Sequence, residues 1–178
     1  MCCTSANAVE VVKNIEADEI IFTPDKNLAA YVQRFTDKKI IPWDGYCYVH
    51  NRFNVDEVTR AREFHPEALM MVHPECPPEI IDLADEVVST GGMVKLARKS
   101  DLKTFLVGTE AGMLYRLRKE NPGKEFYSAG VARTCGGMKA IHIEDLLACL
   151  EKDQFEIRLS SSQMDRARSS LERMLEYG

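Results

Sequence analysis

Apolar and polar positions follow one recurring pattern along the chain. A short run of apolar or small residues is followed by threonine or serine and then by a helix-forming segment. This pattern is typical of a strand, a tight turn and a helix N-terminus, because a Ser or Thr side chain can cap the first free N–H groups of a helix. The pattern occurs at residues 2–12, 20–32, 87–97 and 105–117.

The spacing of these stretches indicates an internal repeat. Thr4 and Thr90 follow equivalent runs and lie 86 residues apart, and Cys47 and Cys135 lie 88 residues apart. Each cysteine stands in a loop that comes after a lysine-led strand. A period of this length predicts two copies of one structural unit, which runs turn, helix, strand, turn, helix, strand and cysteine loop.

Between the two copies the chain continues to alternate helix and strand. We expect a helix at 55–64, a strand at 68–73 and a helix that opens at Pro77-Pro78. Strands that alternate with helices predict parallel sheets with helices on both faces. The expected fold is therefore α/β, with repeated three-layer α/β/α units around small parallel sheets and a helical C-terminal tail. The expected divisions are 1–53, 54–140 and a helical segment at 141–178.

The chain begins abruptly with respect to this pattern. Met1 stands where the end of a strand is expected. A sheet rarely begins with a strand cut at that point, so we expect the chain to lack an N-terminal portion.

Composition narrows the classes of function. There are 23 Lys and Arg against 28 Asp and Glu in 178 residues, and the net charge of −5 argues against a nucleic-acid-binding protein. No apolar run is long enough to span a membrane, and the first residues lack the basic and apolar regions of a signal peptide. Six cysteines without a CxxC pair suit a reducing cytoplasm, where thiols serve as ligands, reactive groups or core side chains.

Cys47 and Cys135 are the sharpest chemical feature, because equivalent loops of repeated units placed around an axis come together. A thiolate from each loop could hold a soft metal ion or an iron–sulfur cluster. Two cysteines are too few for the usual cluster, and a third from a further copy of the unit would leave one iron open. The alternative is that both side chains pack in their loops without a ligand role.

The serine and threonine turns are candidate anion sites, since exposed N–H groups at a helix N-terminus bind phosphate or carboxylate. The candidates are Thr4-Ser5, Ser89-Thr90 and Gly108-Thr109. Ordinary helix capping explains each turn when it is taken singly. Several such turns at one pocket would favour a phosphate or carboxylate ligand.

His73 and Glu75, in the sequence VHPEC, stand at the end of the strand expected at 68–73. The carboxyl ends of parallel strands face the ligand crevice, so this pair could do acid–base work. The alternative is a histidine hydrogen-bonded to its own loop. The next residue, Cys76, is expected to have no role, and Cys149, among apolar residues of a helix, is expected in the core.

Seven motifs in order along the chain together resemble the quinolinate synthase family, whose members act in NAD biosynthesis. The motifs are CTSANAVEVV, PDKNLAAYV, WDGYCYVH, MVHPEC, STGGM, VGTEAGMLYRL and TCGGMK. They extend from residue 3 to residue 139.

The resemblance implies three similar α/β/α domains around a pseudo-threefold axis, two of which fall in this chain. It implies a 4Fe-4S cluster held by one cysteine from each domain, with Cys47 and Cys135 as the second and third. It also implies a reaction in which iminoaspartate condenses with dihydroxyacetone phosphate to give quinolinate, with loss of phosphate and water, at an open iron of the cluster. His73 and Glu75 match active-site residues of the family. The residues that match contacts to the substrates' carboxylates or phosphate are Ser5, Ser89 and Thr90.

The sequence departs from the family because the first domain, with its cysteine, has no counterpart. The third cysteine ligand of the cluster is therefore absent from this chain, and we expect the isolated chain to be a poor enzyme. Two alternatives stay open: a cluster-free α/β module that binds small dicarboxylates or phosphates, and one subunit of a split enzyme. An L-aspartate oxidase or dehydrogenase is the expected supplier of iminoaspartate, and no nucleic-acid or membrane partner is expected.

Overall fold

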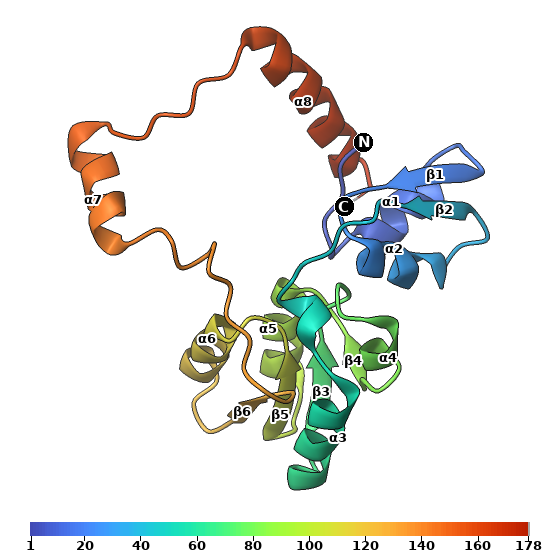
Figure 1. Ribbon diagram of the computed structural model, residues 1–178, viewed down its shortest axis with the longest axis vertical. Coiled ribbons are helices and arrows are strands. Elements are labelled where there is room, and N and C mark those ends of the chain that lie inside the picture. Colours follow the sequence, from blue (N-terminus) through green and yellow to red (C-terminus); the bar gives the residue numbers. More distant parts are fainter. Residues whose placement is uncertain (178) are drawn as a thin grey trace. The chain divides into compact units, whose positions relative to one another are not determined.

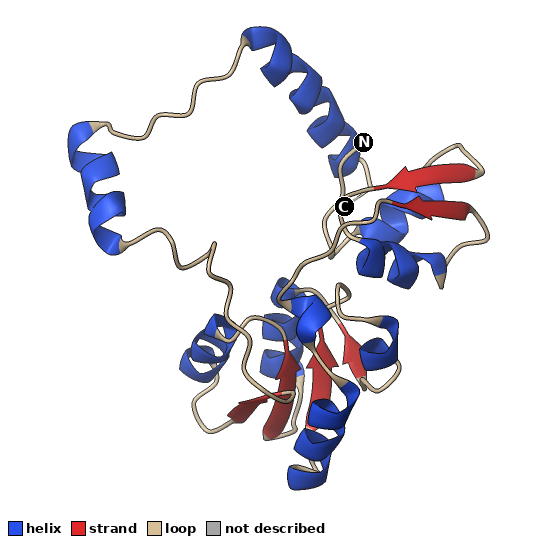
Figure 2. Ribbon diagram, viewed as in Figure 1, coloured by secondary structure: helices blue, strands red, loops and turns tan. Residues whose placement is uncertain are grey.

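Four short parallel strands form the larger sheet of the computed structural model, which describes residues 1–177 (Figures 1 and 2). Their order is β4-β3-β5-β6. The central strands β3 (Leu69–Val72) and β5 (Thr104–Gly108) are almost entirely buried, as their apolar sequences require. The edge strands are β4 (Glu86–Val87) and β6 (Glu125–Ser128).

Helices cover both faces of this sheet, as the sequence predicts. They are α3 (Val55–Phe64), α4 (Pro78–Ile81), α5 (Thr90–Lys99) and α6 (Gly112–Glu120). Met70 and Leu106 belong to the buried cluster beneath α3 and α4. Met71 and Phe105, their neighbours in sequence, belong to the cluster beneath α5 and α6. Successive side chains of each strand therefore serve opposite layers.

A second, smaller sheet consists of two parallel strands, β1 (Glu19–Phe22) and β2 (Lys39–Pro42). Two helices accompany it, α1 (Ala8–Asn14) and α2 (Lys26–Gln33). The apolar side chains of these helices form one buried cluster with those of β1 and β2. This cluster fixes the position of the loop that follows β2.

The two sheets contain copies of one unit, and the structure gives their register. Ile20 of β1 and Phe105 of β5 are 85 residues apart and both pack beneath the helices that flank their strands. The carbonyls of Thr4 and Ser89, also 85 residues apart, each accept from the N–H four residues on, at 2.9 and 2.8 Å. The structural step is thus one residue shorter than the spacing of Thr4 from the next threonine.

A pair of lysines shows the same register. Lys38 precedes β2, and its Nζ donates to the carbonyl of Val12 at the end of α1 (3.0 Å). Lys124 precedes β6, and its Nζ donates to the carbonyl of Ala97 at the end of α5 (2.7 Å). Each lysine thus satisfies free carbonyls at a helix C-terminus, where a positive charge is also favourable.

Residues 135–177, with Met1 and Cys2, form a separate compact unit. It contains the helices predicted for the tail, α7 (Ile143–Lys152) and α8 (Ser161–Leu175), and neither has a buried residue. Cys149 of α7 is exposed, so the expectation that it lies in a core is wrong. The apolar face of α7 is present, but within the described residues it is not packed into a core.

Residues 3–134 form the other compact unit and contain both sheets. The divisions expected at residues 53 and 140 stay predictions. Among residues 1–177, no helix combines the length and the apolar character that a membrane crossing needs.

Candidate functional site

Four polar side chains from separate elements meet beside the carboxyl ends of β3 and β5. His73 and Glu75 follow β3, and Thr109 follows β5. The fourth, His50, begins η1 (His50–Arg52), a short 3-10 helix after β2. His50 Nδ1 lies 2.9 Å from Glu75 Oε2, and His50 Nε2 lies 2.9 Å from Thr109 Oγ1. A loop from the first copy of the repeat thus reaches the sheet of the second.

The hydrogen bonds assign a proton position to each histidine. The N–H of Glu75 donates to His73 Nδ1 (3.3 Å), so the proton of His73 lies on Nε2, which donates to Ser5 Oγ (3.2 Å). In His50, Nδ1 donates to the Glu75 carboxylate, and Nε2 accepts from the Thr109 hydroxyl. Thr109, His50 and Glu75 therefore form a directed chain of hydrogen bonds.

Burial decides the charge state of this group. His73 is 6% exposed, and its removal from water, together with the neighbouring His50, lowers the pKa of His73 to about 4, although Glu75 opposes the shift. Burial alone would raise the pKa of Glu75. The hydrogen bond from His50 and the electrostatic influence of both histidines outweigh burial and hold the Glu75 pKa below its usual value. At neutral pH a neutral His73 thus stands beside an ionised Glu75.

Cys47 is held through its backbone by Asp25, the N-cap of α2. One carboxylate oxygen of Asp25 accepts from the N–H of Leu28 (2.8 Å), and the other accepts from the N–H of Cys47 (2.7 Å). In addition, the N–H of Lys26 donates to the carbonyl of Gly45 (2.8 Å). These bonds tie the Cys47 loop to the N-terminus of α2.

Cys47 lines a cavity of about 390 Å³, together with Asp25 and Glu75. Its sulfur, a ring nitrogen of His50 and a carboxylate oxygen of Glu75 all lie within 4.8 Å of one another, a donor set that could hold a metal ion. Both ring nitrogens of His50 already have partners, so the thiol is the best placed of the three to bind an external group. A thiolate is the usual ligand of an iron–sulfur cluster, so the donor type fits such a cofactor.

Cys135 stands at the position in the second copy that is equivalent to Cys47. The carbonyls of Gly45 and Arg133 each accept from an N–H at the start of α2 or α6, at 2.8 Å in both cases. Each cysteine comes two residues later, and its own carbonyl accepts from the N–H four residues on, at 2.9 Å for Cys47 and 3.2 Å for Cys135. Cys135 begins the other compact unit, and a common site for both thiols stays a prediction.

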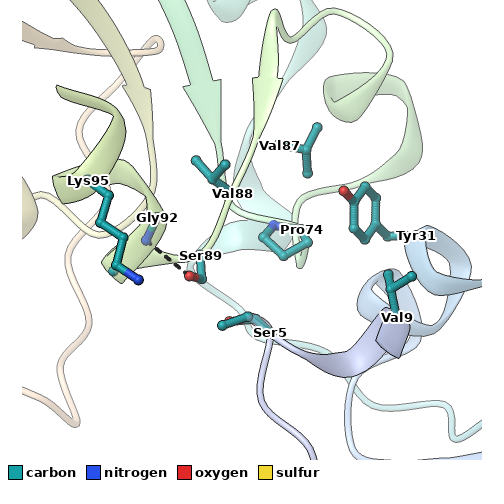
Figure 3. Close-up of a pocket in the computed structure, with 11 residues that line it drawn as sticks. Ser5, Val9, Tyr31, Pro74, Val87, Val88, Ser89, Gly92 and Lys95 are labelled. Carbon is teal, nitrogen blue, oxygen red and sulfur yellow. Dashed lines mark hydrogen bonds between the residues drawn. The ribbon is translucent and has the colours of Figure 1, made fainter. Parts of the chain in front are cut away.

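A second cavity, of about 350 Å³, lies beside the starts of α1 and α5 (Figure 3). Ser5, Ser89 and Lys95 are among the residues that line it. Ser89 caps α5, since its hydroxyl accepts from the N–H of Gly92 (3.2 Å). A Cβ added at Gly91 would meet nothing within 4 Å, so the backbone is open there. A helix N-terminus with a lysine nearby suits an anionic group.

The three predicted substrate contacts differ in their surroundings. Ser5 and Ser89 line this cavity, whereas Thr90, the first residue of α5, is not among its lining residues. Ser5 also accepts from His73. Ser5 therefore connects the anion-type cavity to the histidine and carboxylate group.

Three features of the site escape prediction from sequence. His50 stands three residues after Cys47, a spacing that places both in one turn and that could have signalled it. Thr109 is expected at an anion-binding turn, but its side chain is buried and bound to His50. Asp25 carries an N-cap signal, whereas nothing in the sequence signals its bond to Cys47.

Comparison with known proteins points to one family. The family model described as "Quinolinate synthetase A protein" matches residues 1–176. The quinolinate synthase of Methanosarcina barkeri is 47% identical over 175 residues, and those of Geotalea uraniireducens and Pyrococcus horikoshii are each 49% identical over 175 residues. These matches cover 98% of this chain in the first two and 97% in the third. The chain spans 58% of the length of each of these relatives.

Proposed function

The chain belongs to the quinolinate synthetase A protein family, and on this basis we propose that it forms the greater part of a quinolinate synthase. The proposed reaction condenses iminoaspartate with dihydroxyacetone phosphate and gives quinolinate, with loss of phosphate and water. The observation that carries the proposal is the group of Cys47, His50 and Glu75, whose ligand atoms lie within 4.8 Å of one another. This group stands at the carboxyl ends of parallel strands, where α/β proteins bind their ligands.

The proposed cofactor is a 4Fe-4S cluster. Cys47 and Cys135 would hold it, and the third cysteine would come from a domain absent from this chain. When bound, the cluster supplies an open iron as a Lewis acid for a substrate oxygen. Cys47 suits the ligand role because it lines a cavity and because Asp25 fixes its backbone. A reducing cytoplasm, the proposed location, keeps such thiols available.

The anionic groups of both substrates are proposed to bind at the cavity beside α5. Lys95 brings a positive charge to that cavity, and the first N–H groups of α5 add hydrogen-bond donors. Ser5, Ser89 and Thr90 are the proposed contacts to carboxylate or phosphate oxygens. A phosphate leaving group also keeps its negative charge favourably at this helix end.

His73 and Glu75 are the proposed acid–base pair. Glu75 is ionised at neutral pH and can accept a proton from a bound substrate. His73 is neutral, with its proton on Nε2 directed at Ser5, so it can donate to a substrate oxygen that takes the place of the Ser5 hydroxyl. His50 positions the Glu75 carboxylate through its 2.9 Å hydrogen bond.

A cluster-free α/β module that binds small dicarboxylates or phosphates is the second candidate. The cavity lined by Ser89 and Lys95 favours it, since anion binding there requires no thiolate. One subunit of a split quinolinate synthase is a variant of the first candidate, which suits a chain that spans 58% of its relatives. Iron binding separates the first candidate from the second.

The test is anaerobic reconstitution of the purified chain with iron and sulfide, followed by metal and sulfide analysis and an absorption spectrum. Quinolinate is then assayed with dihydroxyacetone phosphate and with iminoaspartate made by an L-aspartate oxidase. The matched variants are Cys47→Ser and Cys149→Ser, because Cys149 is exposed in α7 and outside the site. We expect iron in the wild type and in Cys149→Ser, and loss of iron in Cys47→Ser.

Two results would count against this proposal. Iron retained in full by Cys47→Ser would remove Cys47 from the ligand set. Binding of phosphate by the wild type without any bound iron would favour the cluster-free module.

A further inference from the structure

Strand β1 has a neighbouring strand on one side only. Within residues 1–177 it pairs with β2, and no strand lies along its other edge (Figure 1). The side chain of Ile21, in the middle of β1, is 74% exposed. Parallel sheets are normally covered on both faces and contain more than two strands, so this edge and this face are unusual.

The second copy of the repeat contains the same element in completed form. Ile21 corresponds to Leu106 of β5, which is 85 residues further on. β5 lies between β6 and β3, and Leu106 is 0% exposed. Leu106 shares a buried cluster with Val58 of α3 and Ile80 of α4. In this copy, one strand and two helices thus cover the edge and the face that remain open at β1.

The backbone of β1 directs its unpaired groups at the open edge. The carbonyls of Asp18 and Phe22 accept from N–H groups of β2 and of the residue after it, at 2.8 Å each. The even-numbered residues therefore face β2, and Glu19 and Ile21 point their N–H and C=O groups the other way. On the corresponding edge of β5, the carbonyl of Gly108 accepts from the residue that follows β3 (3.0 Å).

We infer that the open edge of β1, with the exposed side chains of Ile21 and Ile41, binds a parallel apolar strand flanked by helices. The strand adds to β1 as Leu69–Val72 adds to β5, with an apolar residue opposite Ile21 where Met70 lies opposite Leu106. Main-chain hydrogen bonds give the affinity, and the Ile21 face selects an apolar partner.

The occupant is the part of a quinolinate synthase that lies outside the matched region. The relatives are longer than this chain, which covers 58% of their length, and their additional sequence is the natural source of one more strand with its helices. The inference uses the family relationship and the repeat, and it does not depend on the proposed reaction or its cluster.

The test is co-expression of the whole chain with the remaining part of the Methanosarcina barkeri quinolinate synthase, made as a separate tagged polypeptide. The matched variants are Ile21→Lys and Phe64→Lys, because Phe64 is also exposed, at 82%, but lies at the end of α3. Co-purification, circular dichroism and amide hydrogen exchange at Glu19 and Ile21 are measured. Circular dichroism checks that both variants fold.

We expect the wild type and Phe64→Lys to co-purify equally with the tagged polypeptide, and Ile21→Lys to be recovered at least about tenfold less, since one buried isoleucine contributes more than a tenfold change in affinity. The amides of Glu19 and Ile21 should become protected from exchange in the complex. Equal recovery of Ile21→Lys, unprotected amides, or no complex at all would overturn the inference. A dimer of this chain alone that Ile21→Lys abolishes would also overturn it, in favour of a second copy as occupant.

Discussion

His50 and His73 lie stacked, with ring centroids 4.3 Å apart and ring planes 10° apart. His50 comes from the loop after β2, and His73 comes from the end of β3. The contact therefore joins the two copies of the repeat at the site. Since a positive charge on both rings would be unfavourable at this distance, the stack adds to burial in keeping His73 neutral.

We expect the chain to lose stability as the pH falls below 6.5, because of His73. Its pKa of about 4 in the folded chain lies below the ordinary value of 6.5. The unfolded chain therefore binds the proton first, so this stability is fully present above pH 6.5 and is lost as the pH falls toward 4. The loss amounts to roughly 3 kcal/mol at its full extent. Urea unfolding at a series of pH values measures it.

His73→Gln is the variant that isolates this effect. It removes the titrating ring and keeps a donor that can reach Ser5, so stability should vary less with pH in that range. An unchanged pH dependence in His73→Gln would show that other groups cause the loss.

Replacement of Asp25 should loosen the Cys47 loop. Asp25→Ala removes a helix cap, which costs about 1 kcal/mol, and leaves the N–H of Cys47 without its acceptor, which costs about 1–3 kcal/mol. Asp25→Asn keeps an oxygen for Leu28 and loses the oxygen for Cys47, so it should destabilise less. Urea unfolding measures the difference, and both variants should bind less iron than the wild type after reconstitution. Full iron binding by Asp25→Asn would contradict a positioning role for Asp25.

The two helix-capping lysines should contribute similarly to stability. Lys38→Met and Lys124→Met each remove a charged donor from carbonyls at a helix end, and each should cost about 2 kcal/mol. Lys139→Met, in the second compact unit, is a comparison of the same chemical change elsewhere. Thermal or urea unfolding gives the values. A large effect at only one of the two capping positions would contradict their equivalence.

Lys95 should determine the affinity of the cavity beside α5 for inorganic phosphate. A charge at this partly exposed site is worth about 1 kcal/mol, so Lys95→Ala should weaken phosphate binding about fivefold, and less so at high salt. Lys99→Ala, one turn further along the same helix, is the matched control. Titration calorimetry or phosphate-dependent stabilisation measures the change. Equal weakening in both variants would indicate a general charge effect.

Much of the fold could be predicted because local signals determine its elements. Asn54 caps α3 and Pro78 opens α4 where the sequence indicates, and the apolar run of β3 ends just before His73. The repeat could also be recognised, although its register was one residue off. Equivalent threonines need not occupy equivalent positions, whereas buried side chains such as Ile20 and Phe105 must.

The site was less accessible to sequence reasoning because its contacts join distant segments. His73 and Glu75 stand at a strand end, where α/β proteins place ligand-binding groups. His50 lies 59 residues from Thr109, and no local pattern records their hydrogen bond. The expected burial of Cys149 failed for a related reason: the apolar face of α7 shows what a helix can bury, and only the tertiary structure shows whether a partner is present.

The repeat lengthens along its course, from 85 residues at Ile20 and Phe105 to 86 at Ile40 and Phe126 and 88 at the two cysteines. Both increases fall in connecting segments, because one residue added to a strand would turn every later side chain to the opposite face. These connections therefore mark where the polypeptide tolerates extra length. A spectroscopic label or a short affinity tag inserted near Asp37, between α2 and β2, should leave both sheets and the Cys47 loop undisturbed.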